Sequence, residues 1–329
     1  MKGCRAVTVD LGIVFRPLKE TAMSFTRPLR LVLLGNAFFS TACALLMQIN
    51  PVLLGDLLGV QAPLIYRLIG VGLLVFAADL VHQASRPRLA TWRALYASAG
   101  DVLWVLATIV GLLLFPGVLS PIGLVTVSLM ATVMLVFGLL QMRGIRIAHR
   151  APERDLNRHC IMVRVDVPAP AMWEVIRRIG DIQRYMPSLK SSQILYGREP
   201  GVGAVRHCVD QAGKSWSEEC IAFTPGREFT VRFLADEPGF PFPASEMFGG
   251  WEVMPEEQGG GEREGSVVKV WWELTTKPAW LAPLLLPLLA FQADRDFTGI
   301  IEAMAGDARG EPVSRRATGS GVRLLPLAC

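Results

Sequence analysis

The stretch PIGLVTVSLMATVMLVFGLLQ, residues 121–141, decides the fold of the first half of this chain. It contains no charged residue and is long enough to cross the hydrocarbon core of a bilayer, which needs about 20 apolar residues in a helix. Inside a bilayer, every backbone N–H and C=O group must be satisfied within the segment, which a helix achieves. Residues 121–141 are therefore predicted to form a transmembrane helix.

Three further apolar runs precede this one, at residues 29–49, 63–81 and 99–115. Pro63 and Pro121 stand at the first helical position, where the missing N–H has no partner to lose. Pro116 and Gly117 form a tight turn that makes the third and fourth helices an antiparallel hairpin. The sequence thus predicts a four-helix transmembrane domain over residues 27–148, after an N-terminal tail at 1–26, in which Met23 is an alternative start to Met1.

The positions of lysine and arginine predict how these helices are oriented. Arginines precede the first helix, occupy the loop between the second and third, and follow the fourth, whereas the other two loops contain no lysine or arginine. Because cytoplasmic loops carry the positive charge, both termini are expected to be cytoplasmic, in a multi-pass protein of the cell (inner) membrane. The bilayer is then its first partner, and small residues such as Gly70 and Gly72 are compatible with a homo-oligomer.

Two carboxylates, Asp79 and Asp101, fall at the edges of the predicted helices. A charge at mid-bilayer costs about 2.5 to 3.5 kcal/mol on insertion scales, so each needs an explanation. Both are expected to lie near the cytoplasmic helix ends, where they reach water or pair with Arg86, Arg88 or Arg93. A proton or ion pathway is the alternative interpretation.

The composition changes after residue 150, where charged and apolar residues interleave as in globular domains. Alternating valines at 163, 165 and 167 predict a first, half-buried strand. Two short helices, a meander of about six strands and a long helix from about residue 278 to 304 are expected to follow. The predicted boundaries are 159–305 for this α+β domain and 306–329 for a disordered tail.

This order of elements resembles the SRPBCC superfamily, the START-like helix-grip fold that includes polyketide cyclase and dehydrase-like proteins. The resemblance is carried by 165–170 (VDVPAP) with Trp173, by 185–187 (YMP), by 201–206 (GVGAVR), by 215–219 (SWSEE) and by 251–253 (WEV). It implies an antiparallel sheet that grips the long C-terminal helix around a cavity for an apolar ligand. The membrane half lies outside it.

The strand alternation indicates which side chains face that cavity. The residues expected to bind a hydrophobic small molecule or lipid are Phe229, Val231, Phe233, Val268, Val270, Trp272, Leu284 and Leu288. The same residues could equally fill a solid core. The apolar segment at 280–291 is too short to span a bilayer and is expected to lie in the grip or touch the membrane surface.

Chemistry beyond binding has only scattered candidates. Those for a general acid or base are Tyr185, Arg206, His207, Glu218 and Glu219. Adjacent strand residues point to opposite faces, so Glu218 and Glu219 are not a paired-carboxylate site, and no catalytic set can be assigned. The six cysteines lack metal-ligand spacing and are expected to be free thiols. No metal, no cofactor and no nucleic-acid partner is predicted.

The sequence therefore predicts a membrane-anchored START-like protein whose cytosolic domain binds a hydrophobic small molecule or lipid. Two alternatives remain open. One is an enzyme of the polyketide cyclase or dehydrase type that acts on an apolar substrate, and the other is a membrane-tethered module that binds or regulates a protein partner.

Overall fold

The computed structural model describes residues 18–151, 154–256, 265–313 and 322–325. Its first half is helical: α1 (Leu18–Ile49), α2 (Pro51–Leu58), α3 (Pro63–Ser85), α4 (Thr91–Leu114) and α5 (Pro121–Ala148). Four of these, all but α2, are long and apolar enough to cross a membrane. They coincide with the four predicted spans and are called the bundle below.

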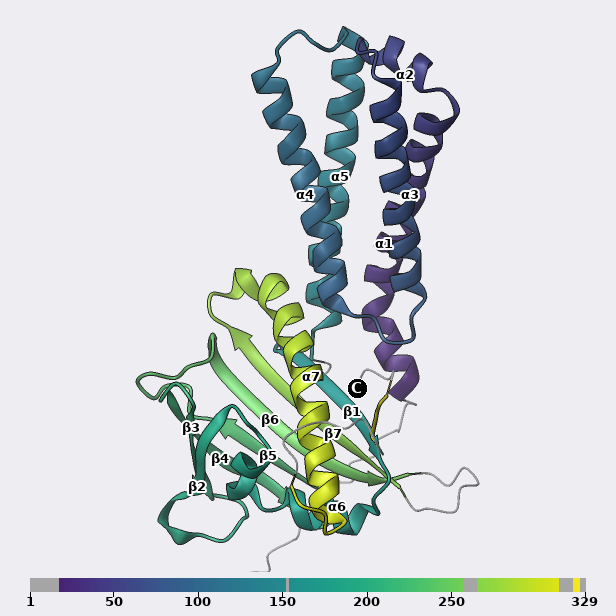
Figure 1. The fold of residues 1–329 in the computed structure, drawn as a ribbon. Helices are drawn as coiled ribbons and strands as arrows, with labels where there is room; N and C mark the ends of the chain where they lie inside the picture. Colours follow the sequence, from purple (N-terminus) through teal and green to yellow (C-terminus); the bar gives the residue numbers. More distant parts are fainter. Residues whose placement is uncertain (1–17, 152–153, 257–264, 314–321, 326–329) are drawn as a thin grey trace, which may run out of the picture.

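The bundle consists of two helix pairs joined through α1 and α5 (Figure 1). α3 packs along α1, α4 packs along α5, and α1 packs on α5, whereas α3 and α4 scarcely touch. Gly144 allows the α1–α5 approach, because a Cβ atom there would fall 2.9 Å from a methyl carbon of Leu29. The side of the bundle between α3 and α4 is therefore held less tightly than the others.

The second half forms the C-terminal domain. Its strands are β1 (Asn157–Val165), β2 (Leu189–Ile194), β3 (Val205–Asp210), β4 (Ser215–Thr224), β5 (Glu228–Phe233), β6 (Ala244–Pro255), β7 (Ser266–Thr276) and β8 (Val322–Leu324). Its helices are α6 (Ala169–Ile176) and α7 (Ala282–Ala308), with short 3-10 turns η1 (Ile179–Arg184), η2 (Leu195–Gly197) and η3 (Ala279–Leu281). The eight strands form one antiparallel sheet in the order β2-β3-β4-β5-β6-β7-β1-β8. An antiparallel sheet with a long C-terminal helix confirms the predicted helix-grip fold.

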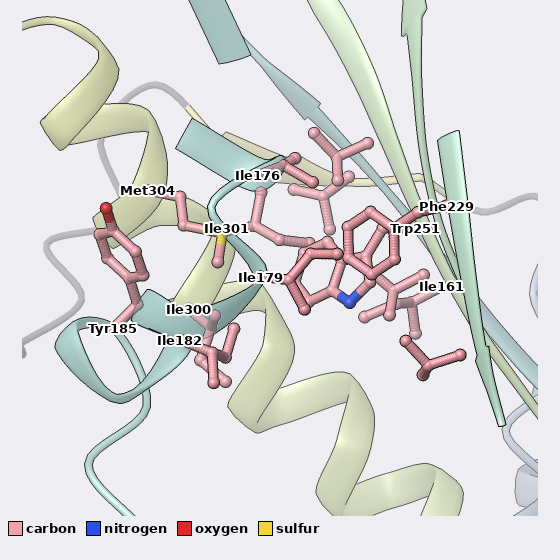
Figure 2. Packing of buried hydrophobic residues seen from close by; sticks show 14 of the residues in the cluster. Ile161, Ile176, Ile179, Ile182, Tyr185, Phe229, Trp251, Ile300, Ile301 and Met304 are labelled. Atoms are coloured by element: carbon pink, nitrogen blue, oxygen red, sulfur yellow. The ribbon is translucent and has the colours of Figure 1, made fainter. Parts of the chain in front are cut away.

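The core of this domain lies between the sheet and α7. Ile161 and Val163 of β1 are fully buried beside Val270 and Val268 of β7, their register partners. Figure 2 shows Phe229 and Trp251 of the sheet on one side and the α7 residue Ile301 on the other, with α6 and η1 packed around them. The C-terminal half of α7 is thus enclosed as a core helix.

Several boundaries differ from those predicted. α1 begins at Leu18, inside the segment expected to be a tail, and α4 begins at Thr91 instead of residue 99. Within the tail expected to be disordered, β8 pairs with β1 through Val163 and Leu324. Pairing with β1 places residues 322–324 in a strand despite their weak local pattern. Among the described cysteines, Cys43, Cys208 and Cys220 are free thiols, but Cys160 is disulfide-bonded, so the expectation of free thiols throughout is wrong there.

Candidate functional site

Six aromatic side chains come from the sheet, from the β5–β6 connection and from α7, and we call them the aromatic strip: Trp216, Phe233, Phe240, Phe242, Trp272 and Phe297. The ring of Phe297, on α7, meets that of Trp272 at a centroid distance of 4.5 Å. Gly249 joins the two ends of the strip, because its missing side chain leaves room for both Phe233 and Trp272. The strip therefore consists of a group of four rings, Trp216, Phe233, Phe240 and Phe242, and the Trp272–Phe297 pair, with Gly249 between them.

Half-burial distinguishes four of the six strip residues from the core around them, whereas Trp216 and Phe233 are buried. Phe240, Phe242, Trp272 and Phe297 are each only partly buried, whereas the strands on either side bury their inward side chains. Phe240 and Phe242 stand on the connection between β5 and β6, at the open edge of the grip. Aromatic rings that pack on one side and face solvent on the other suit the binding of an apolar ring or chain.

The structure brings together most of the residues predicted to bind a ligand. Phe229, Val231, Val268 and Val270 are less than 5% exposed and pack directly into the core. Phe233 and Trp272 belong to the aromatic strip.

The two predicted ligand-binding leucines of α7 lie elsewhere. Leu284 is partly buried, and Leu288 is 56% exposed. The α7 residues that belong to the core of the domain at this level are Ala282 and Leu286. Leucines occur on several sides of the proline-containing start of α7. The helical period of 3.6 residues therefore does not show which of these sides faces the sheet before the helix packs.

Arg206 and Glu218 form a buried ion pair across β3 and β4, on the inner face of the sheet. Arg206 also donates from Nη1 to the carbonyl oxygen of Ile179 at 2.8 Å, and Trp216 donates from Nε1 to Glu218 Oε1 at 2.7 Å. The carboxylate is thus engaged at both oxygens. The pair fixes Trp216 at one end of the aromatic strip, which is a positioning role.

The other candidates for acid–base chemistry lie outside the grip. Glu219 pairs with Arg232 on the exposed face, and His207 faces Ser217 there. Tyr185 donates its hydroxyl to Asp307 at 2.5 Å, which ties η1 to the end of α7. Burial, followed by this hydrogen bond, raises the pKa of Tyr185 to about 12. The candidates therefore do not converge on one point.

A polar junction connects α7 to the bundle. Arg88, in the loop between α3 and α4, pairs with Asp294 of α7, and His159 of β1 contacts the same carboxylate at 2.9 Å. Beside it, the rings of Trp92 and Phe291 lie 5.3 Å apart. Because the His159 ring stacks on Trp272, the junction reaches the aromatic strip directly.

His149 follows the last residue of α5 and lies beside His159 in the polar junction. Its Nδ1 lies 3.1 Å from the carbonyl oxygen of Arg158, which can only accept, so Nδ1 carries the proton. Nε2 then accepts from the hydroxyl of Thr91 at 2.8 Å. Burial, and then the neighbouring His159, lower the pKa of His149 to about 4. The ring is therefore neutral at neutral pH and links α4, α5 and β1.

Apart from the aromatic strip, a hollow of about 510 Å³ lies on the surface of the domain beside α6. Trp173 and Phe223 form its apolar wall, with ring centroids 5.5 Å apart, and the Glu174–Arg177 ion pair lies at its rim. The sequence analysis did not identify this hollow, because α6 and the β4–β5 turn meet only in the folded domain. Its mixed wall offers no group arranged for chemistry.

The two carboxylates of α3 and α4, Asp79 and Asp101, have different environments. Asp79 pairs with Arg93, as predicted. Asp101 is fully buried and accepts hydrogen bonds from Asn36 and Gln141, so the expectation that it reaches water or an arginine is wrong. The helix pattern could not reveal this, because Asn36 and Gln141 come from α1 and α5.

Comparisons with known proteins agree with this architecture. Residues 161–309 match the family model described as polyketide cyclase / dehydrase and lipid transport. No curated protein matches the chain.

Three solved structures illustrate the similarity. XoxI from Bacillus cereus is 16% identical, over 46% of this chain and 95% of that one, with a TM-score of 0.36. An uncharacterised protein from Bacillus thuringiensis is 18% identical, over 45% and 98%, with a TM-score of 0.35. Truncated norcoclaurine synthase from Thalictrum flavum is 16% identical, over 49% and 100%, with a TM-score of 0.38.

Over residues 161–309 the chain matches the polyketide cyclase, dehydrase and lipid-transport family, so the SRPBCC resemblance predicted from the sequence is confirmed for its C-terminal domain.

Proposed function

We propose that this protein is a membrane-anchored receptor for a hydrophobic small molecule or lipid, which binds at the aromatic strip of its C-terminal domain. The observation that carries the proposal is the half-buried state of Phe240, Phe242 and Phe297, in a grip whose deeper side chains are fully packed. An apolar molecule that covered these rings would gain about 25 cal/mol for each Å² of apolar surface removed from water.

The position of the strip next to the bundle supports the same function. The four apolar helices would hold the domain at a bilayer. Trp280 of η3 and the α7 residues Leu288 and Phe291 are all exposed, and they would then lie against the lipid surface, since Phe291 already contacts Trp92 of α4. An apolar ligand would pass between the bilayer and the strip along this edge without crossing much water. The positive charge of the loop between α3 and α4 supports a cytoplasmic orientation of the domain.

The test uses the full chain, purified and placed in phosphatidylcholine nanodiscs. A diazirine-bearing fatty acid is photo-cross-linked to it and the labelled peptides are identified by mass spectrometry. We expect saturable labelling of the β5–β6 connection, β7 and α7. Phe242→Ser removes a half-buried ring of the strip and is expected to lower labelling at least several-fold.

The matched control is Val202→Ser, at an exposed apolar position in the loop before β3. It is expected to leave labelling unchanged. Equal labelling of both variants, or no saturable labelling of the C-terminal domain, contradicts the proposal.

A second function, the binding of a protein partner, is favoured by one observation. Phe229, Val231, Val268 and Val270 fill the grip, while Trp280 and Leu288 present 71% and 56% of their surfaces. An exposed apolar patch beside a solid core is typical of an interaction surface. Absence of labelling in the experiment above, together with loss of partner capture on Trp280→Ser, would favour this function.

A further inference from the structure

The bundle contains a cavity of about 160 Å³ between α3 and α4, separate from the aromatic strip. All four helices of the bundle line it, and its aromatic lining residues are Phe39 of α1, Phe76 of α3 and Trp104 of α4. An apolar cavity of about 150 Å³ suffices to bind a benzene ring. Because α3 and α4 scarcely touch, the cavity lies at the loosely held side of the bundle.

Asp101 is the one charged residue in the lining of this cavity, and it is fully buried. It lies ten residues into α4, which begins at Thr91, or about 15 Å along the helix. Asn36 donates to its two oxygens at 3.2 and 2.9 Å, and Gln141 donates to Oδ2 at 3.0 Å. All the donors are neutral amides, so the carboxylate has no positive partner among the contacts of the described residues.

Two serines fix the orientation of these amides. Ser40 donates to Asn36 Oδ1 at 3.1 Å, and Ser98 donates to Gln141 Oε1 at 2.9 Å. Both amide oxygens are thereby used as acceptors, and both NH₂ groups turn toward Asp101. Hydrogen bonds of this kind stabilise the ionised form of a carboxyl group, so the polar network suits an anion.

An ion pair joins α3 and α4 on the side of Asp101 toward the start of α4. There Arg93 of α4 pairs with Asp79 of α3. Arg93 is thus engaged with another carboxylate and lies about two turns from Asp101 along α4. A buried anion without a counter-charge is costly in a bundle, and a cation bound in the cavity would offset that cost.

The walls of the cavity indicate what kind of cation fits. Aromatic faces such as those of Phe39, Phe76 and Trp104 attract an ammonium group. Met130, Met134 and Leu73 add an apolar surface for its carbon atoms. Within the described residues, no three side chains of metal-ligating type come together. The lining therefore favours an organic cation over a divalent metal ion.

We propose that this cavity is a binding site for a lipophilic amine, whose protonated nitrogen pairs with Asp101 while its hydrocarbon part extends between α3 and α4 into the bilayer. This assigns the bundle a role beyond anchoring. It does not depend on ligand binding at the aromatic strip, so either proposal can fail without the other.

The experiment uses the full chain in phosphatidylcholine nanodiscs and a diazirine-labelled dodecylamine as the probe. Photo-cross-linking followed by peptide mapping is expected to show saturable labelling of the segments around residues 39–43, 73–76, 100–104 and 130–134. Unlabelled dodecylamine should compete, whereas dodecanol and dodecanoate, which have the same chain without the positive charge, should compete at least tenfold less well.

Asp101→Asn removes the charge with little change of shape and is expected to lower labelling at least tenfold. Asp79→Asn is the matched control, because it removes the carboxylate of the ion pair between α3 and α4, outside the cavity lining, and should leave labelling within twofold. Asp101→Glu keeps the charge and should retain part of the labelling, which separates a lost site from a misfolded bundle.

Equal competition by dodecanol, or unchanged labelling in Asp101→Asn, overturns the proposal. Absence of saturable labelling in the unmodified chain also overturns it, and would leave a proton or an inorganic cation as the partner of Asp101.

Discussion

The guanidinium group of Arg88 lies against the carboxylate of Asp294, 206 residues further along the chain. This contact joins the loop between two bundle helices to the helix that the sheet grips. His159 shares the same carboxylate and stacks on Trp272. One short chain of contacts therefore runs from the bundle to the aromatic strip.

Weakening this contact is expected to loosen the junction. Arg88→Gln removes the ion pair while His159 still holds Asp294, and a pair that is partly exposed contributes about 1 kcal/mol. Amide hydrogen exchange should accelerate several-fold in residues 86–93 and 288–297. Arg232→Gln, which breaks an exposed pair on the outer face of the sheet, is the control and should leave these segments unchanged.

The free energy of unfolding is expected to decrease at acidic pH because of His149. Its pKa of about 4 in the folded protein lies below the ordinary value of 6.5, so the unfolded chain binds more protons between these values. The stability gained from the neutral ring is complete above pH 6.5 and is lost as the pH falls toward 4, by about 2 kcal/mol at pH 5.

Thermal unfolding of the full chain at pH 7 and pH 5 measures this loss. His149→Gln should reduce the difference between the two pH values, whereas Val202→Ser, at an exposed position without a titratable group, should leave it unchanged. An identical pH dependence in both variants would contradict the assignment.

The Arg206–Glu218 pair is expected to behave as a structural unit. Glu218→Leu leaves a buried arginine without its partner, which costs about 3 to 5 kcal/mol. The double variant Arg206→Met, Glu218→Leu should recover much of this loss, because no unpaired charge remains. Glu219→Leu, one residue along the same strand, breaks only an exposed pair and should cost less than about 1 kcal/mol. Chemical denaturation of the four proteins gives the comparison.

Two adjacent glycines of β6 are expected to respond differently to the same change. A Cβ atom at Gly250 would lie 2.3 Å from the indole of Trp271, so Gly250→Ala must displace a ring on the outer face of the sheet. The nearest atom at Gly249 is 3.3 Å away, on the movable ring of Phe233. Gly250→Ala should cost about 1 to 3 kcal/mol more than Gly249→Ala. Equal unfolding temperatures for the two variants would contradict this account of the packing.

Local patterns were sufficient for much of the fold. Runs without charge, such as residues 121–141, indicated four helices, because a bilayer admits few other structures. Alternation placed Val268, Val270 and Trp272 on one face with Phe229 and Val231, since the period of a strand is two residues. The same rule separated Glu218 from Glu219.

Only the tertiary structure decided which residues from distant segments meet. The pattern of α4 placed Asp101 near the edge of a helix, but its environment depends on Asn36 and Gln141, which two other helices supply. Likewise, Leu288 looked inward by hydrophobicity, yet docking of α7 against β1 and α4 leaves it exposed. The physical reason is common to both. The local sequence determines the hydrophobic periodicity of each helix or strand and whether its surroundings are lipid or water, whereas the partners of a side chain depend on how elements far apart in the chain pack together.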